Sequence, residues 1–402
     1  MKTGNRWLVV VGGVLMNLSL GAFYGWSLYV PSLEKALNVT RTEVSNIFSI
    51  AVVVFAITFL IAGRLQDKKG PYIVSILGSI IFSLGFFLTS HASSLMEMYL
   101  AYGVVVGIGT GFGYVPPIGV ISKWFPDRRG LVVGIAVGAF GAGSALLGPF
   151  IPGWIAAYGW QSVLMWQGIV YFIATMTAAQ LMKNPPAGYV PAGWTPPIAA
   201  GPTGNGKPAD YTPSEMLRTS QFYRLLVGYA FGISAGLLVI SQLLPFAQLS
   251  ITGMSAALAG TAITIAAISN AAGRILSGWL SDSIGRIRTI SIMVLLSAIT
   301  LPVLGRIDSL WLFWPLIFII YYCYGTQLSL YATTTADFFG AKNVGANYGF
   351  VFLAFGVAGV VGPRLGGVLF DQFKSYTRAF DIAAVLLVIA LVIIATLKPP
   401  RK

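Results

Sequence analysis

Long apolar stretches dominate this sequence and limit the folds that are open to it. Of the 402 residues, 56% are hydrophobic and 9% are charged, whereas soluble domains carry about 25% charged residues. Twelve segments are mainly apolar over about 20 positions, the length that an α-helix needs to cross a bilayer. The sequence therefore predicts an all-α membrane protein with twelve transmembrane helices, at residues 7–30, 44–62, 72–90, 95–121, 130–156, 162–182, 223–245, 254–279, 289–304, 310–337, 346–369 and 379–397.

The apolar segments form two groups of six, separated by a stretch rich in proline and glycine. Residues 183–221 include PPAGYVPAGWTPPIAAGPTGNGKPADYTPS, a composition typical of a linker without its own core. We expect residues 1–182 and 222–402 to form two six-helix bundles. The pattern G-x-L-x-D-x-x-G occurs at 63–70 and again at 278–285. This repeat predicts pseudo-symmetric bundles with a binding site between them, near the middle of the membrane.

Lysine and arginine residues indicate the orientation of the chain. With both termini in the cytoplasm, eighteen of the 25 cationic residues fall on the inner side and five on the outer side. The positive-inside rule favours this arrangement, so we expect a multi-pass protein of the plasma (inner) membrane with cytoplasmic termini. The net charge of +13 is spread over the connections between apolar segments. We therefore expect the lipid bilayer as a partner and no nucleic acid.

Arg274 is the strongest candidate for a substrate-binding residue. It is the only charged residue between Thr252 and Leu280, in the eighth apolar segment. Burying a guanidinium at membrane depth is costly, and residues that bear this cost usually mark a substrate or ion pathway. Arginine stays protonated, and its planar fork of donors fits a carboxylate. The residue therefore predicts an anionic substrate. The alternative is a side chain that extends to the cytoplasmic surface, because Gly278 is only four residues away.

The connection between the second and third segments resembles that of the major facilitator superfamily, whose pattern is G-x-x-x-D-[RK]-x-G. Here the pattern consists of Gly63, Asp67, Lys68 and Gly70. Three further stretches resemble monocarboxylate transporters and oxalate/formate antiporter-like proteins: GAFYGWSLYVPSL at 21–33, WFPDRRGLVVGIAVGAFGAG at 124–143 and SEMLRTSQF at 214–222. The resemblance covers essentially the whole chain. It implies the major facilitator fold, a small carboxylate as substrate and transport by alternating access.

The resemblance also implies that Arg274 pairs with the substrate carboxylate. Asn270 stands where eukaryotic lactate transporters carry a proton-coupling aspartate, and Leu28 lies near the place of their helix-1 lysine. Phe355 stands where the oxalate/formate exchanger has a lysine, after the stretch 347–350 (NYGF). One central cation neutralises a monoanion but leaves a dianion with an unpaired charge in a low-dielectric site. We therefore expect lactate- or pyruvate-like monocarboxylates, with oxalate/formate-type anion exchange as the alternative.

Polar and aromatic residues are expected to complete the substrate site. Asn270 and Arg274 are four residues apart and share a face of the eighth helix. Tyr324, Gln327 and Tyr331 likewise share one face of the tenth helix. The predicted substrate-binding set is Arg274, Asn270, Tyr114, Tyr324, Tyr331, Gln327, Leu28, Tyr24, Phe355 and Phe140. For the aromatic residues, the alternative is a packing role between helices.

Two aspartates are expected to act in gating. An aspartate at a helix end can face the positively polarised N-terminus of a neighbouring helix, and the resemblance implies that such contacts lock the inner gate while the carrier faces outward. By the repeat symmetry, Asp67 would face the eleventh segment and Asp282 the fifth. The predicted gating set is Gly63, Asp67, Lys68, Gly70, Gly278, Asp282, Gly285, Arg286, Arg128 and Arg129. A role in tight turns is the alternative.

The sequence offers little for other chemistry. The single cysteine, Cys323, excludes an internal disulfide, and one histidine, His91, cannot form a metal cluster. A P-loop and a soluble catalytic or signalling domain are absent from the sequence, so ATP-driven transport, an enzyme or a sensor is not favoured. We expect a monomer without a cofactor and with the proton as coupling ion. The twelve acidic residues lie away from the centres of the apolar segments, so the proton would travel on the substrate or on water and tyrosines around Arg274.

Overall fold

The computed structural model describes residues 5–186, 188–191, 210–340 and 343–400, with the backbone alone at 129, 130 and 256. In these ranges the regular structure is entirely helical, which confirms the predicted fold class. The first half contains α1 (Trp7–Leu20), the 3₁₀ segment η1 (Gly21–Leu28), α2 (Val30–Leu37), α3 (Arg41–Lys69), α4 (Pro71–Ser90), α5 (Leu95–Met98), the π-helical segment η2 (Tyr99–Val106), α6 (Gly107–Trp124), α7 (Arg129–Ala142) and α8 (Ile151–Leu181). The second half contains α9 (Pro213–Met216), α10 (Ser220–Ser250), α11 (Ala256–Ile284), α12 (Arg286–Leu304), α13 (Leu310–Phe339), α14 (Val344–Phe373) and α15 (Thr377–Ala395).

The helices account for the twelve predicted segments. Ten helical stretches in the described chain are long and apolar enough to cross a membrane. An eleventh, α13, has 30 residues and is rich in tryptophan and tyrosine. The twelfth is α7 together with the first part of α8. Gly159, with a φ of 79°, divides α8, so its second part corresponds to the sixth predicted segment.

The predicted continuous helix at 130–156 is wrong. α7 ends at Ala142, and turns occupy 143–150 before α8 begins. Glycines in this stretch have low helix propensity, and they also permit a close backbone contact. A Cβ atom built on Gly143 would lie 2.3 Å from the Cα of Gly21, where helix 1 changes to 3₁₀ geometry. The sequence pattern indicates small residues for packing but does not distinguish a packed helix from a broken one.

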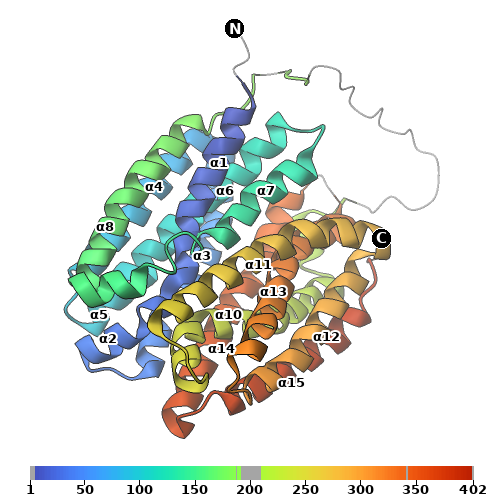
Figure 1. Cartoon of the computed structure of the whole chain (residues 1–402). Helices are drawn as coiled ribbons and strands as arrows, with labels where there is room; N and C mark the ends of the chain where they lie inside the picture. Colours follow the sequence, from blue (N-terminus) through green and yellow to red (C-terminus); the bar gives the residue numbers. More distant parts are fainter. Residues whose placement is uncertain (1–4, 187, 192–209, 341–342, 401–402) are drawn as a thin grey trace.

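The two halves lie side by side, with helices of each half grouped together (Figure 1). They meet mainly where α3 packs on α14, α7 on α11 and η1 on α10. The start of α1 and the described residues that flank the linker, 183–186 and 210–212, lie at one end of the bundles, which we call the linker side. The opposite end, with the connections at 38–40, 91–94, 251–255 and 305–309, is the far side.

The described end of the linker packs on the second half. The backbone N–H of Tyr211 donates to the Phe339 carbonyl at 2.9 Å. The side chains of Asn343 and Asn347 both donate to the Tyr211 carbonyl at 3.0 Å. Asn347, the first residue of the NYGF stretch, therefore fixes the linker to α14. Residues 187 and 192–209 of the predicted linker lie outside the described residues.

Candidate functional site

Arg274 is buried in the linker-side half of α11. The Ser255 hydroxyl accepts from the Leu258 N–H at 3.2 Å and caps the start of the helix, and Gly285, with a φ of 93°, follows its end. At 1.5 Å per residue, Arg274 lies roughly 15 Å before that end. Its side chain is inside the protein, because only 3% of the residue is exposed. The structure therefore does not place the guanidinium at the surface.

The guanidinium of Arg274 bridges the two halves. Its Nε donates to the Asn270 Oδ1 at 3.0 Å, one turn earlier on α11. Its Nη1 donates to the Val137 carbonyl of α7 at 3.0 Å and to the Tyr114 hydroxyl of α6 at 3.4 Å. Its Nη2 donates to the Tyr24 hydroxyl of η1 at 3.3 Å. All four acceptors are neutral oxygens, so these bonds leave the positive charge uncompensated.

No carboxylate in the described chain forms an ion pair with Arg274; the five ion pairs there involve other arginines. A buried charge without an opposite charge is expensive, because neutral dipoles replace only part of its hydration. A single carboxylate is the group that such a site can accommodate most favourably. It would gain charge-assisted hydrogen bonds from two nitrogens of one planar fork.

Three tyrosines and a phenylalanine surround the guanidinium. The Phe140 ring centroid lies 5.7 Å from the Arg274 Cζ, and both Tyr24 and Tyr114 make edge contacts with this ring. The Tyr324 hydroxyl donates to the Tyr24 hydroxyl at 2.9 Å. Because the Tyr24 oxygen accepts from both Arg274 and Tyr324, its own proton remains available to a further acceptor. The close backbone contact between η1 and the end of α7 brings Tyr24 and Phe140 together.

An apolar aromatic wall continues from this site across the contact between α3 and α14. Phe355 is fully buried; it stacks on Phe352 at 5.0 Å and meets Phe55 at 5.6 Å. Phe55 also contacts Tyr114 and Phe140, at 5.5 and 6.0 Å between ring centroids. We did not predict Phe55 from the sequence. In these contacts the neighbours of Phe355 are aromatic rings and not cations.

Three other predicted residues lie apart from the guanidinium contacts. The Gln327 side chain donates to the Gly232 carbonyl of α10 at 3.0 Å. Tyr331 stacks on Tyr229 with ring centroids 4.0 Å apart. Both contacts are within the second half and are consistent with the packing alternative. Leu28 is buried at the end of η1, four residues after Tyr24.

The repeated motif forms two similar helix ends on the linker side. Gly70 and Gly285 follow α3 and α11 with φ values of 85° and 93°, a conformation that glycine adopts without the steric cost of a Cβ. A Cβ on Gly63 or Gly278 would meet no atom within 4 Å. The two final glycines therefore end their helices in a turn that favours glycine, and their part in gating stays a prediction.

The described side chains of the predicted gate form no contacts between the halves in this structure. The Asp282 carboxylate pairs with Arg286 at 2.5 Å, and Arg286 also lies 3.5 Å from Asp337, all within the second half. The described gating side chains of the first half are exposed at the linker side: Asp67, Lys68 and Arg128. The side chain of Arg129 lies outside the described residues. The predicted lock belongs to an outward-facing state, so it stays a prediction.

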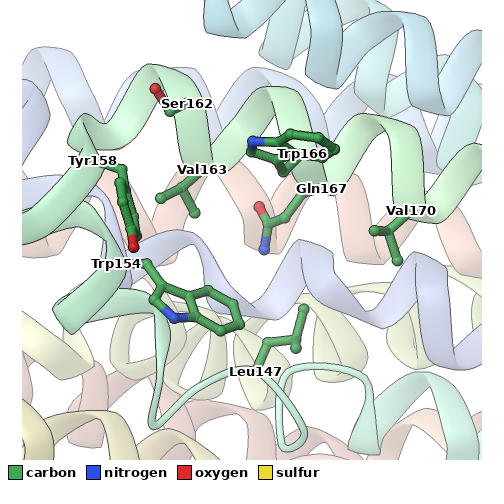
Figure 2. Close-up of a pocket in the computed structure, with 8 residues that line it drawn as sticks. All are labelled: Leu147, Trp154, Tyr158, Ser162, Val163, Trp166, Gln167 and Val170. Atoms are coloured by element: carbon green, nitrogen blue, oxygen red, sulfur yellow. The ribbon is translucent and has the colours of Figure 1, made fainter.

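A cavity of about 500 Å³ lies away from Arg274, on the first half (Figure 2). It is lined by side chains from the break after α7 and from α8: Leu147, Trp154, Tyr158, Ser162, Val163, Trp166, Gln167 and Val170. None of these residues bonds to Arg274. Trp166 and Tyr158 are 61% and 70% exposed, as expected for a helix surface that faces lipid. This cavity is therefore not the anion site.

Comparison with known proteins assigns the chain to a family. The family model described as Major Facilitator Superfamily matches residues 12–319 and 240–402 of the chain. The chain belongs to the major facilitator superfamily. Its fold is similar to the crystal structure of a bacterial homolog of the human lysosomal transporter Spinster in an inward-facing and unoccupied conformation. The TM-score is 0.72 at 17% identity, and the match covers 98% of this chain and 97% of that chain.

Relatives in the major facilitator superfamily align along most of the chain. The uncharacterized MFS-type transporter YhjX of Escherichia coli (strain K12) is 31% identical over 88% of this chain and 86% of its own length. The oxalate:formate antiporter of Oxalobacter formigenes is 28% identical over 99% of this chain and 92% of its own length. Monocarboxylate transporter 11 of Homo sapiens is 26% identical over 96% and 81%. The resemblance stated from the sequence motifs is thereby confirmed at the level of the family.

Proposed function

We propose that this protein is a secondary carrier of small monocarboxylates of the lactate or pyruvate type, working by alternating access. The observation that carries the proposal is the buried Arg274 guanidinium, which bonds only to neutral oxygens. The names of two relatives, an oxalate:formate antiporter and a monocarboxylate transporter, support an organic anion as substrate. The family makes a membrane transporter the expected protein class.

Binding would exchange one set of acceptors for another. Nη1 and Nη2 of Arg274 now donate to oxygens of the first half, on Val137, Tyr114 and Tyr24. A carboxylate that takes these two nitrogens would neutralise the guanidinium and replace bonds that hold the two halves together. The free proton of the Tyr24 hydroxyl could then be donated to the bound anion. Neutralisation and separation of the halves are coupled in this mechanism.

The size of the charge favours monoanions. The wall at Phe355 is built from aromatic rings, among them Phe55 and Phe352. A dianion would place its second charge near this wall or leave it otherwise unpaired, at a cost of several kcal/mol in a low-dielectric site. A methyl group would instead pack against the rings without an unpaired charge. This argument favours lactate and pyruvate over oxalate.

A proton is the coupling ion that we propose. The hydrogen bonds that Arg274 makes to described residues include no acidic side chain, so the proton would move on the acid itself or through the tyrosine hydroxyls and water. The distribution of cations supports a cytoplasmic linker side and an inner-membrane location. Symport of a proton with a monoanion carries no net charge.

Uptake by proteoliposomes tests the substrate. Labelled L-lactate uptake would be measured at pH 6 and pH 7.5, in competition with unlabelled pyruvate, acetate, formate and oxalate. We expect stronger competition by pyruvate than by oxalate and faster uptake with the acidic side outside. Competition mainly by oxalate would refute the monocarboxylate assignment.

Anion exchange is the second candidate, because the oxalate:formate antiporter aligns with 99% of the chain. The same vesicles distinguish the two modes when they are prepared with and without internal lactate. Symport predicts uptake into empty vesicles under a pH gradient. Uptake that requires internal anion, whatever the gradient, would establish exchange and exclude symport.

A further inference from the structure

At the far-side start of α3, two of the free backbone donors are satisfied by the other half of the protein. The first N–H groups of a helix have no partners within the helix and carry partial positive charge. Thr40 caps the N–H of Glu43 at 3.3 Å. Asp371, near the end of α14, accepts from the two preceding N–H groups, that of Arg41 at 3.2 Å and that of Thr42 at 2.8 Å, and also bonds to the Thr42 hydroxyl.

The Arg41 side chain adds a second connection at the same place. Its Nη2 donates to the Glu34 Oε2 of α2 at 2.7 Å, and its Nη1 bonds to the Tyr376 hydroxyl, just before α15. Its Cζ lies 4.4 Å from the Phe370 ring centroid. Only 8% of Arg41 is exposed. A buried guanidinium is thus held by an acid of its own half and by a hydroxyl and a ring of the other half.

A third connection lies one turn deeper. Gln242 of α10 is fully buried; its Nε2 donates to the Ser45 hydroxyl of α3 at 2.8 Å, and its Oε1 accepts from the Tyr376 hydroxyl at 3.1 Å. A Cβ on Gly367 of α14 would lie 2.8 Å from both the Ser45 Oγ and the Thr42 Cα. The backbones of α3 and α14 are therefore in close contact here, with little room for water.

These bonds are unevenly placed along the membrane axis. Within the described halves, the hydrogen bonds between them lie either at the level of Arg274 and Tyr324 or on the far side. On the linker side, Asp282 and Arg286 bond within their own half. Among the described residues, separation of the two halves at the linker side breaks no hydrogen bond outside the level of Arg274, whereas separation at the far side breaks several.

We propose that Arg41, Thr42 and Ser45 of the first half, with Gln242, Asp371 and Tyr376 of the second, form a far-side latch. The latch holds the empty carrier closed at its far side, and it must open before substrate can enter there. The proposal rests on the alternating access of the proposed function. The latch uses the same physical arrangement that is expected from the sequence at the opposite side, an aspartate facing a helix N-terminus.

Thiol labelling of purified protein in lipid nanodiscs tests the latch without any substrate. Ser49 lies one turn after Ser45 on α3 and is 5% exposed, so a Ser49→Cys reporter should react slowly while the latch is closed. We expect Asp371→Asn to raise its labelling rate about tenfold, because the substitution weakens hydrogen bonds to a charged acceptor. Peptide mass spectrometry separates this reporter from the native Cys323, which is 1% exposed between α12 and α13.

Two controls make the result specific. Asp381→Asn breaks another far-side ion pair, with Arg306 at 2.7 Å, but within the second half, so it should leave the labelling of Ser49→Cys unchanged. Labelling of Cys323 should stay slow in both variants. An unchanged reporter in Asp371→Asn, or an equal effect of Asp381→Asn, would overturn the latch. If Asp371→Asn also exposes Cys323, the protein has lost structure more widely, and the milder Thr42→Val is tested instead. In that variant, faster labelling of the Ser49→Cys reporter without labelling of Cys323 supports the latch, and unchanged labelling of the reporter refutes it.

A failure of the latch would be distinct from a failure of the proposed function. The labelling assay contains no carboxylate, and the vesicle assay contains no cysteine reporter. Selective labelling with no lactate uptake would support the latch and refute the substrate. Lactate uptake with unchanged labelling would support the substrate and refute the latch.

Discussion

Replacing Arg274 with lysine keeps the charge but removes the planar fork. The guanidinium now uses three nitrogens to reach oxygens 3.0 to 3.4 Å away on α11, α7, α6 and η1. A lysine ammonium has a single nitrogen at the end of an unbranched chain, so it cannot contact Asn270 and also present two parallel donors to a carboxylate.

The expected loss follows from the number of bonds. A hydrogen bond that involves a charged group contributes about 1.5–3 kcal/mol. If Arg274→Lys loses one of two such bonds to the carboxylate, the apparent affinity for lactate should fall roughly 10- to 100-fold, because about 1.4 kcal/mol corresponds to a factor of ten. The retained charge should still attract the anion, so transport should persist at high lactate concentration.

Initial rates of labelled L-lactate uptake over a wide concentration range measure this effect as a rise in KM. Arg306→Lys is a matched control, because Arg306 is half-exposed and pairs with Asp381 at the surface of the second half. A thermal-unfolding measurement on each variant shows whether it is folded. A folded Arg274→Lys variant with a KM within about twofold of the wild-type value would refute the two-point carboxylate site.

Three further changes test other parts of the structure. Phe355→Lys places an unpaired cation among buried rings, which is costly; we expect a less stable protein that oxalate stabilises in thermal-unfolding assays and whose lactate uptake oxalate inhibits more strongly. Gly143→Ala would put a methyl group 2.3 Å from a backbone atom of the facing helix. It should lower the free energy of unfolding by about 1–3 kcal/mol, seen as an unfolding temperature several degrees lower. In the control Gly134→Ala on α7, the methyl group meets no atom within 4 Å, so the unfolding temperature should not change. Hydrogen bonds from Arg6 lower the pKa of the Asp127 carboxyl, so this pair should stabilise the protein above pH ~4 and lose that effect as the pH falls through the lowered pKa. The stability difference between the wild type and Asp127→Asn, at most about 1 kcal/mol for such a surface pair, should therefore vanish in acid; a difference that persists at low pH would contradict this.

Composition and spacing were sufficient for the large features of the fold. The number of apolar segments and the repeated helix ends around Asp67 and Asp282 follow from local sequence, because bilayer thickness and turn geometry act on short stretches of chain. The break at 143–150 does not follow. It depends on a close contact with Gly21, more than a hundred residues away, and small residues are equally compatible with a continuous helix.

The site was predictable where a residue is unusual for its surroundings. A charge in an apolar helix identifies Arg274, and helix periodicity adds Asn270, its partner one turn away. The Val137 carbonyl could not be found, because every residue has one. Phe55 belongs to a stripe of aromatics on α3, with Phe48 and Phe59, that could have indicated it.

The far-side latch illustrates the same limit. Arg41 and Asp371 lie at helix ends, where charged residues are common, and 330 residues separate them. From the sequence, Arg41 is one of the five cationic residues expected on the outer side. Its burial and its partners depend on how two helices from different halves meet, which no local pattern records.

The most direct test of the central claim is an experimental structure of the protein with bound pyruvate. We predict that the carboxylate lies within hydrogen-bonding distance of Nη1 and Nη2 of Arg274 and that the bond to the Val137 carbonyl is lost. Pyruvate bound elsewhere, with the Arg274 contacts to the first half unchanged, would contradict the account.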